Sequence, residues 1–264
     1  MSQTLTLEIA QSLVAEATDH LDDDYTSYHI DASQYSGITE EAAQALAEHH
    51  HSLYLDGLTS LSVAAAQAFS QHEGYLYLNG LTSLSDAAAQ ALAQHNDFLI
   101  LGGLTSLSDA AAKAFSQHEG YLYLHGLTSL SDAAAQALAQ HEGNLYLNGL
   151  TSLADAAAKA LAQSEGYLSL NGLTSLPDSP GHVALAVKLA KQEIDLYLPG
   201  LTSLSNAAAK ALAKHEGNLY LNGLTSLTDA TAKALADHNG KVHFGALPEK
   251  DEWLYGKYCV ERCL

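Results

Sequence analysis

The sequence predicts an α/β solenoid, in which each turn of the chain contributes one short strand and one helix. The main observation is a repeat, because the pentapeptide Gly-Leu-Thr-Ser-Leu occurs eight times in the 264 residues. Its copies begin at Gly57, Gly80, Gly103, Gly126, Gly149, Gly172, Gly200 and Gly223. Six of the seven intervals are 23 residues and the sixth is 28. One structural unit therefore recurs at a nearly constant length.

Each unit reads as a strand, a turn and a helix. The segment "LYLNG" alternates apolar and polar residues, which is the two-residue period of a strand, and Gly80 then permits a sharp bend. Ser85 precedes Asp86 and an alanine run, a pattern typical of an N-cap with an acid in the first helical turn. We expect the helix to end near His95, and glycines to supply a left-handed residue after it. These glycines are Gly74, Gly120, Gly143, Gly166, Gly217 and Gly240.

The polar residues of the helix form a narrow stripe. In "DAAAQALAQ" they fall only at Asp86, Gln90 and Gln94, so neighbouring helices and a strand layer must cover the other sides. Strands at the same phase in every coil predict a parallel sheet. Such strands stack at about 4.8 Å, whereas helices need roughly 8–10 Å. We therefore expect a horseshoe with strands on its concave face and helices on its convex face.

The core of each coil, Leu-x-Leu-x-Gly-Leu-x-x-Leu, resembles the leucine-rich repeat superfamily over about residues 28–247. It is most similar to the short, alanine-rich repeats of bacterial proteins. The resemblance implies a right-handed solenoid. One departure is that Leu81 and its equivalents stand where the family carries Asn or Cys, whose ladder satisfies the turn backbone. We expect the hydroxyl of Thr82 and its equivalents to take over that task.

We expect a single solenoid domain over residues 1–264. Residues 1–28 would form a helical cap, residues 29–247 about ten coils, and residues 248–264 a C-terminal cap. Weaker copies of the strand pattern occur at both ends, at Ile30, Ala32, Tyr35 and Ile38, and at Val242, Phe244 and Leu247. The capping residues would be Leu7, Ile9, Ala10, Leu13, Val14 and Ala17 at one end, and Trp253, Leu254 and Tyr258 at the other.

One coil, near residues 172–199, is irregular. It holds five extra residues between Leu176 and a helix that Ser179 and Pro180 would start. The inserted segment 177–181 should bulge at one edge of the solenoid. Insertions in solenoids often contact partners, and a tolerated scar of duplication is the alternative.

The residues between the strand leucines should point onto the strand face, because successive side chains of a strand alternate. The candidate partner-binding residues are Tyr54, Tyr75, Tyr77, Phe98, Ile100, Tyr121, Tyr123, Tyr146, Tyr167, Tyr197 and Tyr220. Tyrosine is enriched at protein interfaces, which favours a recognition surface. The alternative is a tyrosine ladder that only stabilises an in-register sheet. Ile100, Ser169 and His243 interrupt the central column, and this variation favours recognition.

The net charge of −19 is unevenly distributed. No Lys or Arg precedes Lys113, whereas 15 of the 30 acidic residues do, so this part carries −15 and the remainder −4. Such a field repels nucleic acid and anionic membranes. It favours a protein or peptide partner, and a basic one through charge and cation–π contacts. Solubility of the repeat surface is the alternative explanation, and the oligomeric state is left open.

Histidines form a second register at the helix C-termini, at His72, His95, His118, His141, His215 and His238. Stacked imidazoles are conceivable metal ligands. However, a histidine at a helix C-terminus also interacts with the exposed carbonyls and the helix dipole. No cysteine or paired carboxylate accompanies them at ligand spacing, so we expect neither a metal nor a cofactor. The adjacent His49, His50 and His51 give no stronger signal.

No catalytic residues are expected, because the chain shows no Ser-His-Asp order, phosphate-binding loop or metalloprotease helix. The sequence thus predicts a non-catalytic scaffold for protein–protein interaction. The alternatives are a purely structural or spacer protein, and binding of metal or a small ligand along the histidine register. With no signal peptide or transmembrane segment recognised, a cytoplasmic location is expected. Cys259 and Cys263 form no disulfide framework.

Overall fold

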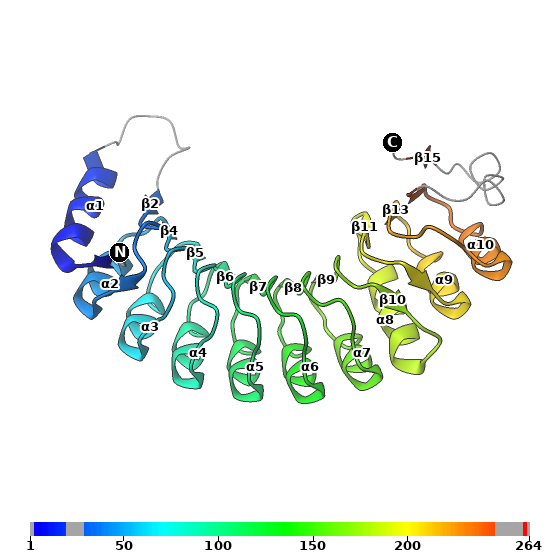
Figure 1. The fold of residues 1–264 in the computed structure, drawn as a ribbon, viewed down its shortest axis with the longest axis horizontal. Coiled ribbons are helices and arrows are strands. Elements are labelled where there is room, and N and C mark those ends of the chain that lie inside the picture. The colour runs from blue at the N-terminus through cyan, green and yellow to red at the C-terminus, as the bar shows by residue number, and fades with distance from the viewer. Residues whose placement is uncertain (1–2, 20–28, 246–260, 263–264) are drawn as a thin grey trace. The chain divides into compact units, whose positions relative to one another are not determined.

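The computed structural model describes residues 3–19, 29–245 and 261–262. It divides into two compact units, Met1–Leu127 with Gln140–Tyr146, and Thr128–Ala139 with Leu147–Leu264. In each unit, helix–strand units repeat along the chain, with the helices on one side and the strands on the other (Figure 1). The predicted α/β class and the repeating units with parallel strands are confirmed.

The first unit contains one continuous parallel ladder. Its helices are α1 (Leu7–Asp19), α2 (Glu40–Ala47), α3 (Val63–Phe69), α4 (Asp86–Leu92) and α5 (Asp109–Phe115). The strands that pair in order are β2 (His29–Asp31), β4 (Ser52–Tyr54), β5 (Leu76–Tyr77), β6 (Leu99–Ile100), β7 (Leu122–Tyr123) and β8 (Leu145–Tyr146). Leu53 lies opposite Leu76, and Leu76 opposite Leu99, so each strand pairs with its copy one period later.

The second unit repeats this design around the irregular coil. Its helices are α6 (Asp132–Leu138), α7 (Asp155–Leu161), α8 (Pro180–Ala190), α9 (Asn206–Leu212) and α10 (Asp229–Leu235). Its strands are β9 (Leu168–Ser169), β10 (Ser175–Leu176), β11 (Leu196–Tyr197), β12 (Ser203–Leu204), β13 (Leu219–Leu221), β14 (Val242–Phe244) and β15 (Glu261–Arg262). Strands β11, β13, β14 and β15 pair in parallel, and β10 pairs with β12. As predicted, Pro180 begins the helix of the irregular coil, with Ser179 at its N-cap.

The core of each coil is built from strand leucines and helix alanines. In one coil Leu76, Leu78 and Leu81 are fully buried, together with the alanines of the next helix face. Phe69 and Phe115 fill the position that Leu92 holds in α4, and all three are fully buried. Burial of leucine and phenylalanine supplies roughly 1.5–3 kcal/mol per side chain. Small alanines let the helices approach one another closely.

The helix N-caps follow the prediction, whereas the glycine prediction is wrong. Ser85 Oγ accepts a hydrogen bond from Ala88 N at 3.2 Å and caps α4. The helix ends at Ala93, which keeps helical angles. Among the glycines of the described residues only Gly74 has a positive φ, at 147°.

The glycines are required instead by close packing between coils. A Cβ on Gly120 would lie 2.0 Å from Asp97 O, and one on Gly143 would lie 2.2 Å from Gly120 O. Contacts this short are far inside van der Waals range. Any larger residue would therefore push adjacent coils apart.

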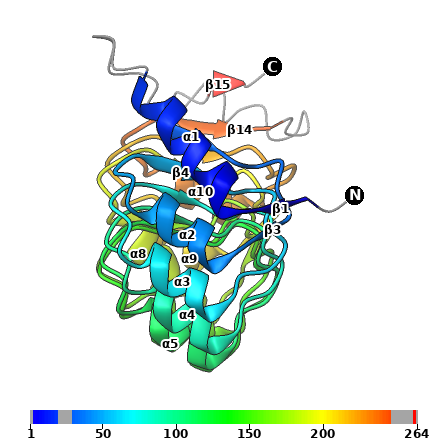
Figure 2. The ribbon, with the colours of Figure 1, turned by 90° about the vertical axis from the view of Figure 1, so that its left-hand side faces the viewer.

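The N-terminal segment packs against the first coil. Figure 2 shows α1 beside α2, with β1 (Thr4–Leu5) paired to β3 (Gly37–Ile38). Leu5 and Ala10 are fully buried. Leu7 departs from the expectation, because it is 39% exposed.

The weak coils at the two ends are also present. Ile30 lies opposite Leu53 in the first unit, and Val242 lies opposite Leu219 in the second. The predicted C-terminal residues Leu247, Trp253, Leu254, Tyr258, Cys259 and Cys263 lie outside the described residues. Within the described residues, no helix has the length and apolar character that crossing a membrane requires.

Candidate functional site

The aromatic residues of the strand face stack on one another within each unit. Tyr54 and Tyr77 have ring centroids 4.2 Å apart and planes 10° apart, and Tyr123 and Tyr146 are 4.2 Å and 3° apart. A second column runs beside these pairs, with Phe98 at 4.2 Å from Tyr75 and 4.3 Å from Tyr121. In-register parallel strands place equivalent side chains about 4.8 Å apart, which brings the rings into contact.

The predicted residues differ in how much surface they offer. Tyr75 and Tyr121 are exposed in the first unit and Tyr197 in the second, at 38%, 37% and 44%. Ile100 is buried, so it supports the surface rather than contributing to it. The other predicted residues are half-buried: Tyr54, Tyr77, Phe98, Tyr123, Tyr146, Tyr167 and Tyr220. In the second unit Tyr220 stacks on Tyr197 at 4.4 Å and on His243 at 4.3 Å.

Self-stacking changes which part of each ring a partner can reach. The faces of Phe98 are covered by Tyr75 and Tyr121, so a cation can reach only the outer faces at the ends of this column. Burial and the neighbouring Tyr54 side chain raise the pKa of Tyr77 to about 12. Burial and Tyr146 likewise raise the pKa of Tyr123. The surface therefore presents ring edges and uncharged phenol groups at neutral pH.

Side-chain carbonyl groups form a ladder along the strand ends, which the sequence reasoning missed. Asp56 Oδ1 accepts from Asn79 N and Asn79 Nδ2, both at 2.9 Å, and Asn79 Oδ1 accepts from Gly102 N at 2.8 Å. In the second unit Asn148 Oδ1 accepts from Asn171 N at 3.0 Å. The ladder satisfies backbone N–H groups between coils. The recurrence of Asp or Asn two residues after the central column was the available signal.

A similar set of hydrogen bonds lies beside the aromatic column of the second unit, which is formed by Tyr197, Tyr220 and His243. Asp195 Oδ1 accepts from Asn218 N at 2.8 Å, and Asn218 Oδ1 accepts from Lys241 N at 3.2 Å. The bond from Asn218 N lowers the pKa of Asp195. The predicted threonine contacts occur as well, since Thr59 Oγ1 donates to Ser36 O and Thr174 Oγ1 to Thr151 O, at 3.2 and 2.8 Å.

The histidine register is a buried stack of rings. Its centroid distances are 6.1 Å from His72 to His95, 6.2 Å from His95 to His118 and 5.9 Å from His118 to His141. In the second unit His215 and His238 are 6.4 Å apart. In the first unit the four histidines are at most 3% exposed, so a solvent-borne ligand has little access to them.

Two of these imidazoles, those of His72 and His118, are neutral at pH 7. Burial lowers the pKa of His72 and of His118 to about 4. His215 Nδ1 lies 3.2 Å from Ala190 O, a hydrogen bond to the preceding coil. In the first unit Ala47 O and His51 O face His72, although neither ring nitrogen has a hydrogen bond of good geometry. His72 and His118 therefore act as packed, neutral core residues.

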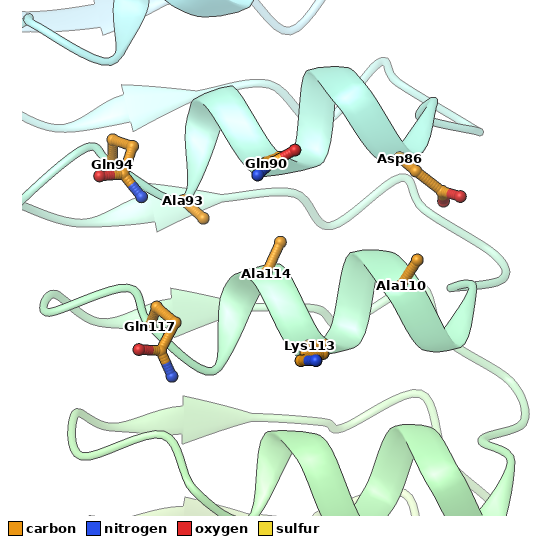
Figure 3. Close-up of a pocket in the computed structure, with 8 residues that line it drawn as sticks. All are labelled: Asp86, Gln90, Ala93, Gln94, Ala110, Lys113, Ala114 and Gln117. Carbon is orange, nitrogen blue, oxygen red and sulfur yellow. The ribbon is translucent and has the colours of Figure 1, made fainter.

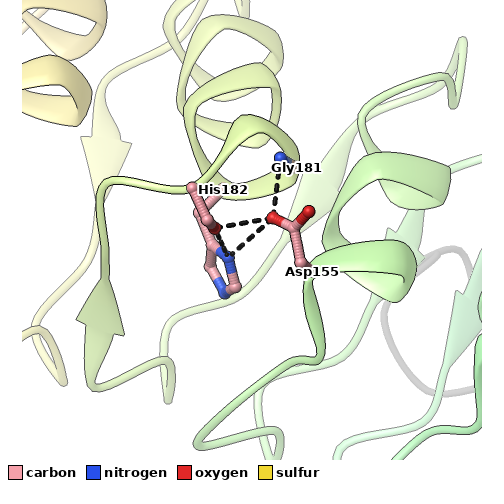
Figure 4. A network of polar contacts seen from close by, with 4 residues as sticks. Asp155, Gly181 and His182 are labelled. Atoms are coloured by element: carbon pink, nitrogen blue, oxygen red, sulfur yellow. Dashed lines mark hydrogen bonds and ion pairs between the residues drawn. The ribbon is translucent and has the colours of Figure 1, made fainter.

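A serine, a histidine and an aspartate meet at the start of α8 (Figure 4). Asp155 Oδ1 accepts from Ser179 Oγ at 2.6 Å and from Gly181 N at 2.7 Å, and Ser179 Oγ lies 2.8 Å from His182 Nδ1. A catalytic triad needs the carboxylate on the histidine nitrogen remote from the serine. Here Asp155 Oδ1 lies 3.5 Å from the same Nδ1. The cluster therefore caps α8, and the Ser179 hydroxyl lowers the pKa of Asp155.

The helix side of the first unit carries a groove of about 390 Å³ between α4 and α5. Figure 3 shows its lining residues, which are Asp86, Gln90, Ala93, Gln94, Ala110, Lys113, Ala114 and Gln117. The polar stripes of the two helices and the alanines between them form its walls. In the described part of the chain, no group of three or more His, Cys, Asp or Glu side chains is arranged to hold a metal ion.

No protein-family model matches the chain. No curated protein matches it either.

Proposed function

We propose that this protein is a non-catalytic scaffold that binds a protein or peptide on the aromatic strand face. The observation that carries the proposal is the pair of stacked columns in the first unit, with Tyr75 and Tyr121 exposed at the ends of one column. Tyrosine offers a large contact area with few rotors and a polar tip. Stacking at 4.2 to 4.3 Å holds these rings in place before binding, which reduces the entropy lost on association.

The partner that we propose is a basic protein or peptide rather than nucleic acid or membrane. The chain carries −15 before Lys113, and this charge repels phosphate-bearing partners. Because the ring faces are largely covered, we propose that basic groups of the partner contact phenol oxygens and acidic side chains rather than stack on ring faces.

We also propose that the coils are right-handed leucine-rich repeats of the short bacterial type. The Leu-x-Leu-x-Gly-Leu-x-x-Leu core supports this, as do the parallel strands paired one period apart. Closely stacked strands and wider helices favour curvature with the strands on the concave side of a horseshoe. The ladder from Asp56 and Asn79 would take the part of the family's Asn ladder, displaced to the end of the strand.

The proposal is tested by replacing both Tyr75 and Tyr121 with Ser. Ser169 occupies the neighbouring column in another coil, so the strand tolerates serine. A matched control is Gln90→Ser with Gln117→Ser on the helix side. We expect the tyrosine variant, and not the control, to lose the partners that the wild-type chain captures from its host, while circular dichroism shows both folded. Equal capture by the tyrosine variant would refute the proposal.

A purely structural or spacer role is the second candidate, and the continuous ring stacking favours it. In that case the tyrosine variant would melt at a lower temperature and capture the same partners. Binding of metal or a small ligand along the histidine register is the third candidate. Titration with zinc or copper while the melting temperature is recorded tests it, since a ligand of the folded state must raise that temperature.

A further inference from the structure

The helix of the irregular coil differs from the regular helices on its exposed side. The regular helix α7 exposes Asp155 and Lys159, one turn apart. The buried residues of the two helices align, which places Val183 and Val187 of α8 at these two positions. The aligned buried residues are Ala157, Ala158 and Leu161 in α7, and Leu185, Ala186 and Leu189 in α8. The polar stripe of the repeat is therefore replaced by valine in α8.

Exposed apolar surface and lysines occur together at this coil. Val187 is 39% exposed, and Ile194, in the turn after α8, is 56% exposed. Helix α8 packs against α7 and α9. The position of Val187 in α8 is occupied by Lys159 in α7 and by Lys210 in α9. We call this surface the lysine-bordered patch. It comprises Val183, Val187 and Ile194 with the exposed residues Lys159, Lys191, Lys210 and Lys214, and its border also includes the exposed acids Asp155 and Glu193.

The first unit carries a surface of the opposite kind. Val63, the first residue of α3, is 39% exposed. The same helical position holds Glu40 in α2 and Asp86 in α4, and both are exposed. Asp86 also lines the groove between α4 and α5, next to α3 (Figure 3). We call this surface the acid-bordered patch. It comprises Val63, Glu40 and Asp86 with the groove, which also contains Lys113.

Single exposed apolar residues are common and need no explanation. The two patches differ from such residues because Val63 and Val187 each replace a polar residue that the repeat otherwise keeps, and because acids predominate on the border of one patch and lysines on the border of the other. Opposite borders around apolar centres steer two surfaces together and fix their register. We infer that the protein associates with a second copy of itself, with the lysine-bordered patch of one copy packed on the acid-bordered patch of the other. This association uses the helix side and is separate from the proposed function of the strand face.

The contact is heterologous, because two different surfaces meet. Each pair therefore leaves one patch of each kind free, and further copies add until the assembly closes or remains an open chain. Both patches are small, and interfaces below about 1,200 Å² belong to weak and transient complexes. Their charged borders are exposed, so salt screens the attraction. We expect association in the micromolar range at low ionic strength, and its loss at high ionic strength.

Sedimentation velocity of the whole chain tests the inference. At low ionic strength the apparent mass of the wild type should increase with protein concentration, from 27.9 kDa toward twice that mass or more. At high salt the apparent mass should return to 27.9 kDa. The double variant Val187→Gln with Ile194→Gly removes the apolar centre of the lysine-bordered patch. Other coils carry Gln136 and Gly217 at the equivalent positions, so the repeat accepts both residues. The double variant Val63→Asn with Glu40→Gln disrupts the acid-bordered patch. Helix α9 begins with Asn206, so asparagine is accepted at the first position of a helix in this repeat. Each variant alone should remain monomeric.

Mixing the two variants decides whether the contact is heterologous. Each variant keeps the patch that the other lacks, so an equimolar mixture should form dimers and nothing larger. A wild type that stays monomeric at every concentration overturns the inference, as does undiminished association of either variant. A mixture that stays monomeric while the wild type associates overturns the pairing of the two patches. Replacing Tyr75 and Tyr121 with Ser should leave association unchanged, which separates this test from that of the strand face.

Discussion

Acidification should destabilise the fold through the buried histidine stack. Folding holds the pKa of His72 and His118 at about 4, against an ordinary value of 6.5. Between these values the unfolded chain binds more protons than the folded chain does. Stability is therefore complete above pH 6.5 and decreases as the pH falls toward 4.

The size of the effect follows from the same two pKa values. At pH 5, a shift from 6.5 to about 4 corresponds to about 2 kcal/mol for each histidine. Water close to the rings screens part of this, so we expect a loss of about 2–4 kcal/mol for the pair. Burial lowers the pKa of His95 and His141 too, while Asp97 and Glu142 partly oppose it. The total is a large fraction of the 5–15 kcal/mol that is typical of a domain.

Urea unfolding followed by circular dichroism between pH 7.5 and pH 5, at constant ionic strength, measures this loss. His118→Gln is the matched variant, because Gln192 occupies the same register in the irregular coil and hydrogen-bonds Leu168 O at 3.2 Å. We expect the variant to lose about 1–2 kcal/mol less than the wild type over this pH range. The reasoning is refuted if the wild type has the same free energy of unfolding at both pH values, or if the variant shows the same loss.

Three further substitutions test the packing. Gly143→Ala would place Cβ 2.2 Å from Gly120 O, so we expect the free energy of unfolding in urea to fall by about 2 kcal/mol or more. The control Gly37→Ala should leave that free energy nearly unchanged, because its Cβ would lie 3.6 Å from the nearest atom. Phe115→Ala empties a fully buried site and should cost about 3–5 kcal/mol, against less than about 1.5 kcal/mol for Phe115→Leu. Asp155→Ala removes the acceptor of the hydrogen bonds from Gly181 N and Ser179 Oγ, and the melting temperature should fall.

For the strand-face residues, the alternating pattern predicted the face of the sheet but not the exposure of each side chain. Alternation placed Tyr75 and Tyr121 on the exposed side of the sheet, and the structure leaves both exposed. It did not separate Ile100, which is buried although it holds a central-column position. Alternation assigns a face to a side chain, whereas exposure depends on the size of the neighbouring side chains. Here the larger neighbours Phe98 and Tyr123 contact each other beside Ile100, at 6.1 Å.

Residues with more than one physical use were the ones misinterpreted. Gly120 and Gly143 follow helices, which favours a left-handed turn, but they are needed because the backbone of the preceding coil leaves no room for a Cβ. His72 and His118 lie at helix ends, where a histidine can interact with the exposed carbonyls and the helix dipole, but burial keeps them neutral. In both cases the deciding partner lies in the neighbouring coil, about one period away in sequence.

The 23-residue period by itself determined the coils, the pairing of each strand with its copy and the serine that starts most helices, because periodicity and capping act within one repeat. Only the tertiary structure decided the charge of His72 and His118, the need for glycine at Gly120 and Gly143, and the ladder from Asp56 to Gly102. Those features depend on distances between coils. Such distances arise only when the repeats stack, because a single coil leaves its leucines and its buried polar groups open to water.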